Sequence, residues 1–177
     1  MLKLITNSPI ESYTNSENPE LLIISGMHGD EFSIINDLRD FLKENIDKLP
    51  PCLFIPEASP TAVKAQTRKN SNENDLNRSF SENTDDLEAS RIIKQLNNYH
   101  FNNVFSFHED LESDAFYFYT SQRISSKILD EFRNDLINHD ISLFSGIDDQ
   151  NDPTLSNVVK DGYIYEPFSQ NLATSAT

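Results

Sequence analysis

The sequence is poor in several residue types, and each shortage argues against a class of protein. Its single cysteine, Cys52, excludes a disulfide framework and a zinc cluster held by thiolates. No apolar run approaches the roughly 20 residues that a bilayer-crossing helix needs. Only 14 basic residues stand against 29 acidic ones, and a net charge of −15 repels phosphates, which argues against a general nucleic-acid binder. The first residues turn polar too early for a signal peptide, so we expect a cytoplasmic protein.

The remaining composition is sufficient for a folded domain. Hydrophobic residues make up 37% of the chain and aromatic residues 10%, which argues against full disorder. A length of 177 residues favours one domain, so we expect residues 1–177 to form a single domain. Glycine and histidine are scarce, with four of each, and His28 lies between Gly26 and Gly29.

Apolar segments of two kinds alternate along the chain. Continuous short runs, typical of buried strands, are residues 21–25, 52–55, 104–107, 115–119 and, more weakly, 162–165. Apolar residues at helical spacing are found at 34–42, from about 85 to 96, and at 128–137. Thr84 is the candidate N-cap of the second helix. Strands that alternate with helices of this length predict an α/β fold with a mostly parallel central sheet flanked by helices.

The loops that leave the predicted strands hold most of the unusual polar residues. Residues 26–31, 56–80 and 108–114 each follow a strand. In an open α/β sheet, ligands bind beyond the carboxyl ends of the strands, so we expect the functional site there. The stretch 56–81 is long for a connection inside a compact domain, and such connections are often functional.

His28 and Glu31 form a His-x-x-Glu pair just past the first strand. Residues three apart face one another on a helical turn, so both can reach one metal ion. Hydrolytic zinc sites use three protein ligands and an open position for water, and His108, which also follows a strand, would complete such a set. A His-x-x-Glu pair is also common by chance. The other two histidines, His100 and His139, lie in polar surroundings typical of the surface.

The 56–81 stretch concentrates basic residues in an acidic chain. Four of the 14 basic residues fall there: Lys64, Arg68, Lys69 and Arg78. One interpretation is a solvated loop of mixed charge. The other is a local positive pocket, where arginine suits a carboxylate ligand because its planar guanidinium donates two hydrogen bonds at once.

Four motifs occur in a fixed order along residues 21 to about 119. They are Gly26-Met27-His28-Gly29-Asp30-Glu31, then Arg68, then Asp75-Leu76-Asn77-Arg78, then His108-Glu109-Asp110. This order, with the motifs placed after the expected strands, resembles the zinc carboxypeptidase family, including its succinylglutamate desuccinylase and aspartoacylase branch. The resemblance implies the fold of that family, a mixed, mostly parallel sheet flanked by helices, in a metallohydrolase catalytic domain.

The resemblance also implies a role for each matching residue. The implied Zn²⁺ ligands are His28, Glu31 and His108. Arg68 would polarise the scissile carbonyl and stabilise the oxyanion, and Asn77 and Arg78 would hold the terminal carboxylate of the substrate. Bound zinc lowers the pKa of its water toward about 7 and acts as a Lewis acid on the carbonyl. The implied substrate is a small peptide or an N-acyl amino acid with a free carboxylate.

The sequence departs from the family pattern at two places. Many members carry an aspartate two residues before the last histidine ligand, where this chain has Ser106, and a weaker partner of the imidazole typically lowers zinc affinity about 10–100-fold. Glu109 and Asp110 are alternative partners. The general base of the family is a glutamate on a late strand, and Glu166 is the only acidic residue after Asp161. Residues 173–177 resemble the small-residue segment that leads into the catalytic strand, so the chain is either a trimmed family member or one cut before its base.

Three functions are therefore open. The leading hypothesis is a zinc-dependent, metallocarboxypeptidase-like hydrolase that cleaves an amide bond next to a free carboxylate. The alternative within this class is an N-acyl amino acid deacylase, which the sequence hardly separates from the first because the ligand sets are alike. The alternative from another class is a non-catalytic relative that binds zinc or a carboxylate ligand without turnover, because Ser106 and the unassigned base both weaken the case for catalysis.

Overall fold

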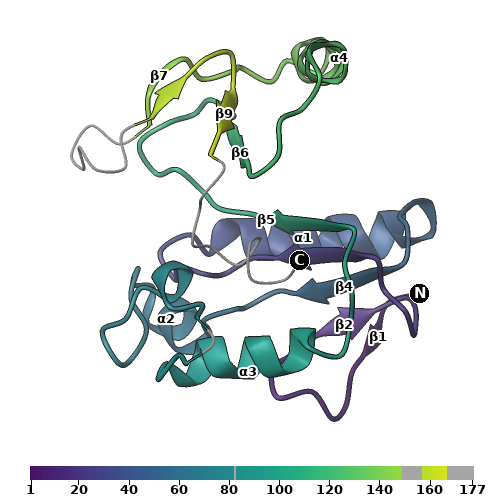
Figure 1. The fold of residues 1–177 in the computed structure, drawn as a ribbon, viewed down its shortest axis with the longest axis vertical. Helices are drawn as coiled ribbons and strands as arrows, with labels where there is room; N and C mark the ends of the chain where they lie inside the picture. The colour runs from purple at the N-terminus through teal and green to yellow at the C-terminus, as the bar shows by residue number, and fades with distance from the viewer. Residues whose placement is uncertain (82, 149–156, 167–177) are drawn as a thin grey trace. The chain divides into compact units, whose positions relative to one another are not determined.

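The computed structural model describes residues 1–81, 83–148 and 157–166 of the chain. These residues belong to two compact units, one within Met1–Glu109 and the other within Asp110–Ser169 (Figure 1). The ligand and substrate residues expected from the motifs fall within the first unit, whereas the candidate base Glu166 and the alternative imidazole partner Asp110 fall in the second. The proposed metal site can therefore be described entirely within one unit.

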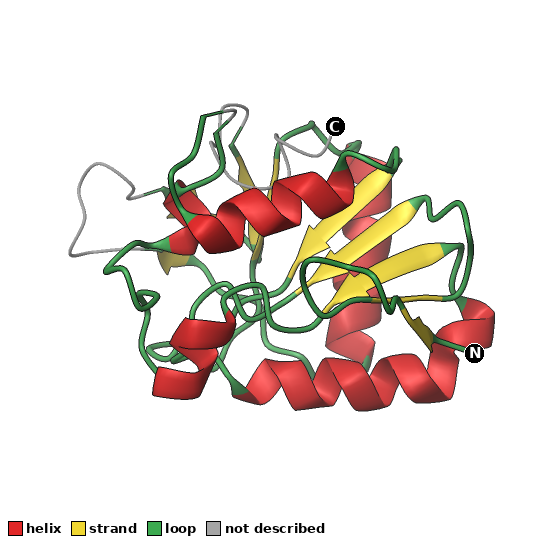
Figure 2. Ribbon diagram, turned by 90° about the horizontal axis from the view of Figure 1, so that it is seen from below, coloured by secondary structure: helices red, strands yellow, loops and turns green. Residues whose placement is uncertain are grey.

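The first unit is built on a five-stranded sheet with the order β1-β2-β4-β3-β5. Its strands are β1 (Lys3–Leu4), β2 (Tyr13–Thr14), β3 (Leu21–Ile24), β4 (Cys52–Ile55) and β5 (Asn103–Ser106). β3 runs parallel to both β4 and β5, whereas β1 and β2 are antiparallel additions beyond β4 (Figure 2). The prediction of a mixed, mostly parallel sheet with helices is confirmed.

Helices cover both faces of the central strands, which explains why β3 and β4 are uninterrupted apolar runs. The helical elements of this unit are α1 (Ser33–Asn45), η1 (Ile46–Lys48), α2 (Pro60–Ala65), η2 (Leu76–Arg78) and α3 (Leu87–Leu96). Leu22 and Ile24 of β3 share one buried cluster with residues of α3. The alternate residues Leu21 and Ile23 share the other buried cluster with residues of α1. The sheet is therefore the middle of three layers.

Two helices differ from the sequence prediction, α3 at its start and α2 because no helix is predicted there. The predicted cap of α3, Thr84, is wrong: the carboxylate of Asp86 caps this helix and accepts hydrogen bonds from the backbone N–H groups of Glu88 and Ala89. The Thr84 hydroxyl instead accepts from the N–H of Asp86. α2 lies within the stretch that shows little periodicity, because six residues are too few to display a helical repeat.

β5 differs from the prediction in its burial. The sequence predicts a buried strand at 104–107, but β5 is the outermost strand on its side of the first unit's sheet, and none of its residues is fully buried. Phe105 is 53% exposed. Hydrophobic pattern alone cannot separate an inner strand from an edge strand, because both are apolar. His108 consequently follows an exposed strand rather than a buried one.

The described residues of the second unit form one helix and two pairs of short strands. These are β6 (Phe118–Thr120), α4 (Ser126–Asn138), β7 (Gly146–Ile147), β8 (Val158–Val159) and β9 (Tyr163–Tyr165). β6 runs parallel to β9, and β7 is antiparallel to β8. The ring of Phe118 lies 5.3 Å, between centroids, from the rings of both Phe132 and Tyr163. Aromatic packing therefore joins α4 to the β6–β9 pair.

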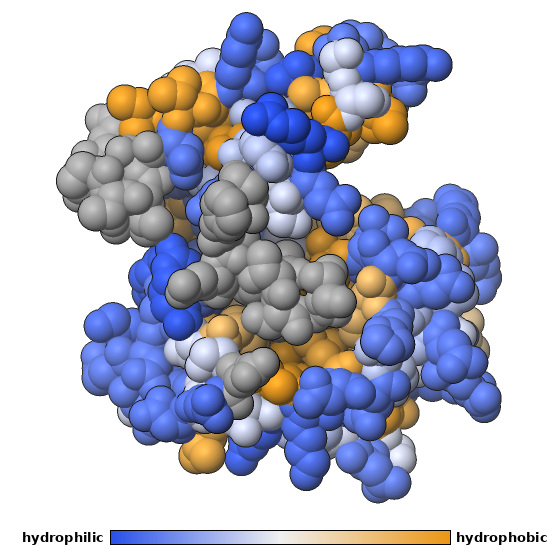
Figure 3. All heavy atoms as spheres, viewed as in Figure 1, coloured by the Kyte–Doolittle hydropathy of each residue, from blue (hydrophilic) through white to orange (hydrophobic). Residues whose placement is uncertain are grey.

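The surface is mostly polar. Hydrophilic side chains make up much of the visible surface in Figure 3, in keeping with a mean hydropathy of −0.54 and a net charge of −15. In the described part of the chain, none of the helices has both the length and the apolar character needed to cross a membrane.

Candidate metal centre

The loop after β3 presents His28 and Glu31, and glycine makes its path possible. Gly26 has a φ of +65°, which side chains other than glycine rarely adopt. Gly29 packs so closely on α2 that a Cβ there would lie 1.9 Å from the backbone oxygen of Ala62. The N–H of Gly29 also donates to the backbone oxygen of Thr67, at 2.8 Å. The loop is therefore fixed against α2 and the segment that follows it.

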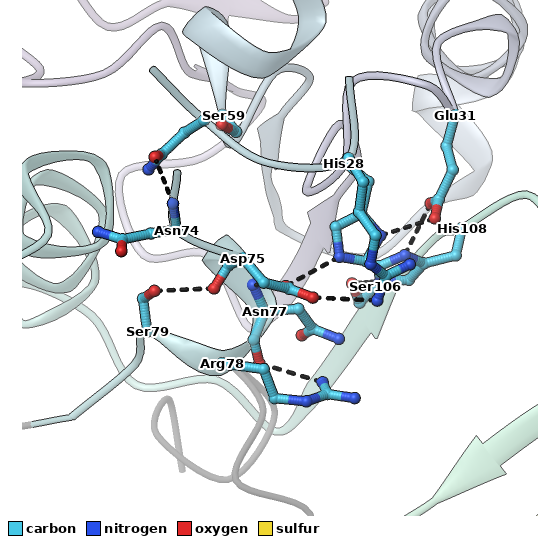
Figure 4. A network of polar contacts seen from close by, with 12 residues as sticks. His28, Glu31, Ser59, Asn74, Asp75, Asn77, Arg78, Ser79, Ser106 and His108 are labelled. Atoms are coloured by element: carbon cyan, nitrogen blue, oxygen red, sulfur yellow. Dashed lines mark hydrogen bonds and ion pairs between the residues drawn. The ribbon is translucent and has the colours of Figure 1, made fainter. Parts of the chain in front are cut away.

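The three predicted ligands come together at the carboxyl ends of β3 and β5 (Figure 4). Nδ1 of His28 lies 2.6 Å from one carboxylate oxygen of Glu31, and Nδ1 of His108 lies 2.8 Å from the other. One ligand atom from each residue falls within 4.8 Å of the other two. His28 and Glu31 are buried, whereas His108 is exposed. The arrangement offers two imidazole nitrogens and a carboxylate to one point at the margin of the sheet.

The far nitrogen of each imidazole is held by a second residue. Nε2 of His28 lies 3.0 Å from Oδ1 of Asp75, and Nε2 of His108 lies 3.1 Å from Oγ of Ser106. In neutral histidines that donate from Nε2 to these oxygens, the Nδ1 lone pairs point toward Glu31. This is the tautomer that a metal bound at Nδ1 requires. The donor set therefore fits a tetrahedral metal ion such as zinc, with one position left for water.

Ser106 occupies the position expected for an imidazole partner, but Asp75 is a partner that the sequence did not predict. Asp75 lies 47 residues from His28 in the sequence. It belongs to the same motif as Asn77 and Arg78, for which the resemblance implies contact with the substrate and not with a metal ligand. The alternative partners of His108 have other roles. The Glu109 carboxylate accepts hydrogen bonds from the backbone N–H and the hydroxyl of Ser33 at the start of α1, and Asp110 accepts from the Tyr117 hydroxyl.

Arg68 lies beside the same aspartate. Its guanidinium nitrogen is 3.0 Å from Oδ2 of Asp75, so one carboxylate joins Arg68 to His28. Arg68 remains about half exposed. Asp75 also accepts from the backbone N–H of Asn77 at the start of η2, at 3.0 Å. The structure thus places the predicted oxyanion residue next to the ligand cluster and outside it.

Arg78 has no acidic partner within ion-pair distance among residues 1–81, 83–148 and 157–166. Its guanidinium is exposed, and among the described residues it donates a single long hydrogen bond, 3.5 Å, to the backbone oxygen of Asn77. An arginine in this state is free to bind an anionic ligand. His100 and His139 are exposed, as predicted, and His139 lies on the second unit at the end of α4.

Burial and hydrogen bonding act in opposite directions on the charges of this cluster. Burial disfavours the charged form of His28, but the hydrogen bonds to Asp75 and Glu31 outweigh it and raise the pKa of His28 to about 9. Burial likewise disfavours the Glu31 carboxylate, yet its bonds to His108 and His28 lower the pKa of Glu31 to about 2. Despite burial, the pKa of Asp75 also falls well below its ordinary value, through the hydrogen bond and charge of His28 and the charge of Arg68.

The family of the chain follows from its sequence match. Residues 17–131 match the model of the succinylglutamate desuccinylase/aspartoacylase catalytic domain. The chain belongs to this family. The match covers β3, β4 and β5 and all the predicted ligand and substrate residues. No curated protein matches the sequence.

Solved structures of metallopeptidase-like proteins share the fold of this desuccinylase/aspartoacylase family member. A candidate metallopeptidase from Shewanella denitrificans is 24% identical, with a TM-score of 0.73, covering 97% of this chain and 68% of its own. One from Shewanella amazonensis is 18% identical, with a TM-score of 0.74 and coverages of 99% and 73%. An aspartoacylase family protein from Mesorhizobium loti is 23% identical, with a TM-score of 0.52 and coverages of 72% and 43%. These similarities show the fold, and the family match indicates a hydrolase of the succinylglutamate desuccinylase/aspartoacylase type.

Proposed function

We propose that the chain is a zinc-dependent hydrolase that cleaves an amide bond next to a free carboxylate. The observation that carries this proposal is the pairing of both imidazoles. Each Nδ1 faces the carboxylate of Glu31, and each Nε2 is held by Asp75 or Ser106. Metal-ligating histidines are oriented in this way by partners on their other nitrogen. Histidines that served only the core would need no such convergence.

In this proposal, His28, Glu31 and His108 hold the zinc ion, which supplies Lewis acidity and an activated water when bound. Arg68 points its positive charge at the oxygen of the scissile carbonyl and stabilises the charge that develops there. Arg78 holds the free carboxylate of the substrate, because a guanidinium without an acidic partner can donate two hydrogen bonds to it.

Asn77 would join Arg78 in holding the substrate carboxylate. Its backbone N–H is committed to Asp75, whereas its side-chain amide makes no hydrogen bond in the described ranges of the chain. An amide donor beside a guanidinium suits a carboxylate, since both of its oxygens accept hydrogen bonds. The adjacent pair on η2 therefore supports a substrate with a free carboxylate.

Zinc analysis tests the proposed site. We expect the purified wild-type protein to bind one zinc ion, and His28→Ala and His108→Ala to lose it, because three protein ligands are needed for a stable site. His100→Ala, which removes an exposed histidine that is not one of the three clustered ligands, is the matched control and should retain zinc. Wild-type protein with no more zinc than the His28→Ala and His108→Ala variants would contradict the site.

Two substrate classes fit a site of this kind: peptides with a free C-terminus and N-acyl amino acids. The match to the desuccinylase/aspartoacylase model supports the second class, and the fold shared with metallopeptidases is compatible with the first. Release of C-terminal amino acids should be assayed beside hydrolysis of N-succinyl and N-acetyl amino acids. Activity on N-acyl amino acids alone would assign the chain as a deacylase, and activity on peptides alone would assign it as a carboxypeptidase.

Glu166 is the candidate general base in this proposal. It directly follows β9, and its backbone N–H donates to the backbone oxygen of Thr120, at 2.9 Å, which extends the pairing with β6. Residues 173–177, compared above with the segment that leads into the catalytic strand, lie outside the described residues.

Glu166→Gln separates an enzyme from a non-catalytic relative. If Glu166 takes the proton of the water, the variant should lose about 10²–10⁴-fold in kcat and keep its zinc. Asp161→Asn, in the turn before β9, is a matched change of a carboxyl to an amide and should remain active. Zinc binding without turnover on either substrate class would favour the non-catalytic relative, which binds zinc or a carboxylate ligand only.

A further inference from the structure

A buried carboxylate outside the recognised motifs holds the loop that carries the proposed substrate residues. Asp86 is 1% exposed and caps α3 through Oδ1, which accepts from two backbone N–H groups at 2.9 and 3.0 Å. Its other oxygen, Oδ2, accepts from the side-chain amides of Asn70 and Asn74, at 2.6 and 2.9 Å. The same carboxylate therefore joins the start of α3 to the loop before η2.

The two asparagines fix the shape of a tight turn in this loop. Asn70 is 4% exposed, and its Oδ1 accepts from the backbone N–H groups of Asn72 and Asn74. Its backbone N–H donates to the backbone oxygen of Asn74, at 3.0 Å. Because the amide oxygen of Asn70 is occupied by the turn, its NH₂ group has to point away from the turn, where Oδ2 of Asp86 receives it. The turn and the carboxylate therefore specify one another.

The turn ends at the residue that orients the metal centre. Asn74 directly precedes Asp75, whose two oxygens lie 3.0 Å from Nε2 of His28 and 3.0 Å from a guanidinium nitrogen of Arg68. A shift of Asn74 moves the backbone of Asp75, and with it both of these contacts. Asp86 thus acts on the centre through Asn74, without touching a ligand itself.

A second buried carboxylate braces the other side of the loop from the same helix end. Glu88 is 7% exposed, and it accepts from the Ser59 hydroxyl at 2.5 Å and from the backbone N–H of Thr61 at 3.0 Å. Thr61 in turn accepts, through its hydroxyl, from the backbone N–H of Ser71. Glu88 holds the start of α2, the helix on which Gly29 packs. The start of α3 therefore supports both α2 and the turn before Asp75.

We propose that Asp86 is a positioning residue of the metal centre, acting through Asn70 and Asn74 to hold Asp75 against His28 and Arg68. The inference rests on the proposed zinc site. It adds a residue that none of the four motifs contains and that lies eight positions beyond Arg78. The helix cap alone does not require aspartate, since serine caps helices about as well. The contact with the loop needs the second carboxylate oxygen, Oδ2, which accepts from Asn70 and Asn74 and which serine lacks.

Asp86→Ser and Asn74→Ala test this role from the two sides of the contact. Asp86→Ser keeps a capping oxygen for α3 but cannot reach the loop, and Asn74→Ala removes one donor and leaves Asp86 intact. We expect each variant to bind zinc about 10–100-fold more weakly than wild type. The double variant should lose little more than the single ones, because both remove the same link. Asn72→Ala is the control, since this exposed side chain makes no hydrogen bond in the described part of the turn.

Amide exchange of the metal-free protein gives a readout that does not depend on zinc. The N–H of Asn77 donates to Oδ1 of Asp75, so it reports how firmly Asp75 is held. We expect it to exchange about tenfold faster in Asp86→Ser and Asn74→Ala, with the amides of α3 unchanged. Folded variants with wild-type zinc affinity, or with unchanged exchange at Asn77, would overturn the proposal. Absence of zinc from wild-type protein would count against the proposed function, and exchange at Asn77 would then decide the role of Asp86 in holding Asp75.

Discussion

Replacing Arg68 with alanine is expected to lower kcat by about 10²–10³-fold and to leave zinc binding in place. The guanidinium lies 3.0 Å from one oxygen of Asp75, whose other oxygen is 3.0 Å from the ligand His28. Arg68 is therefore held beside the ligand cluster without belonging to it. Its loss removes a charged donor that would face the developing oxyanion. The measurement is kcat on whichever substrate class is hydrolysed, with zinc content determined on the same samples.

Two further variants, one at Arg68 itself and one at the adjacent Lys69, test whether the effect belongs to the guanidinium of Arg68. Arg68→Lys keeps the charge but loses the planar guanidinium, so its activity should fall between those of wild type and Arg68→Ala. Lys69→Ala removes an exposed cation that forms no ion pair with the described residues, and it should behave as wild type. A loss of less than about tenfold in Arg68→Ala, or a simultaneous loss of zinc, would show that Arg68 is not the oxyanion residue.

The central part of the fold could be predicted because burial on both faces leaves an unmistakable pattern. β3 and β4 are continuous apolar runs since every one of their residues is buried. β1 and β2 have only two residues each, too few for any periodicity to show. The exposed edge position of β5 depends on which strands pair with it, and pairing is a property of the whole sheet.

The metal ligands could be predicted for a geometric reason. The residues that hold their imidazoles could be predicted only in part. β3 and β5 are parallel neighbours, so residues that follow their carboxyl ends meet at one edge. Ser106 could be expected beside His108, since side chains two apart along a strand point to the same side. The contacts of Asp75 and Asp86 cross a loop without periodicity, and only the folded turn at residues 70–74 brings them into place.

The family match supports the order of the motifs as the decisive sequence signal. Each motif by itself is short. The turn at residues 70–74, between Arg68 and the motif that begins at Asp75, shows no pattern in the sequence. Asn70 and Asn74 look like ordinary loop residues until their amides are seen to converge on one buried carboxylate. Positioning residues of this kind are invisible to pattern analysis, because their partners are distant in sequence and their side chains never reach the ligand.

Stability of the metal-free protein should be greatest between about pH 4.5 and 6.5. The pKa of Glu31 falls from 4.5 to about 2, so its contribution is complete above pH 4.5 and is lost as the pH falls through 2. The pKa of His28 rises from 6.5 to about 9, so its contribution is complete below pH 6.5 and is lost as the pH rises through 9. These directions bear directly on zinc, because the metal needs the His28 proton removed.

Zinc affinity should therefore keep rising with pH well beyond the ordinary range of histidine. Between pH 7 and pH 9 we expect a gain of about 50-fold, because His28 must give up a proton on binding and its neutral fraction rises from about 1% to about half over this range. Competition with a chelator of known affinity at fixed total zinc measures this dependence, and each binding event should release a proton at pH 7.

Asp75→Asn provides the matched control for this dependence. It keeps the shape of the His28 partner but removes the carboxylate that accepts the His28 hydrogen bond, and that bond is among the causes of the raised pKa of His28. Its zinc affinity should be lower overall and should level off at a lower pH than in wild type. A wild-type affinity that is flat from pH 7 upward would show that His28 is already neutral at pH 7, and that Asp75 orients the imidazole without holding its proton.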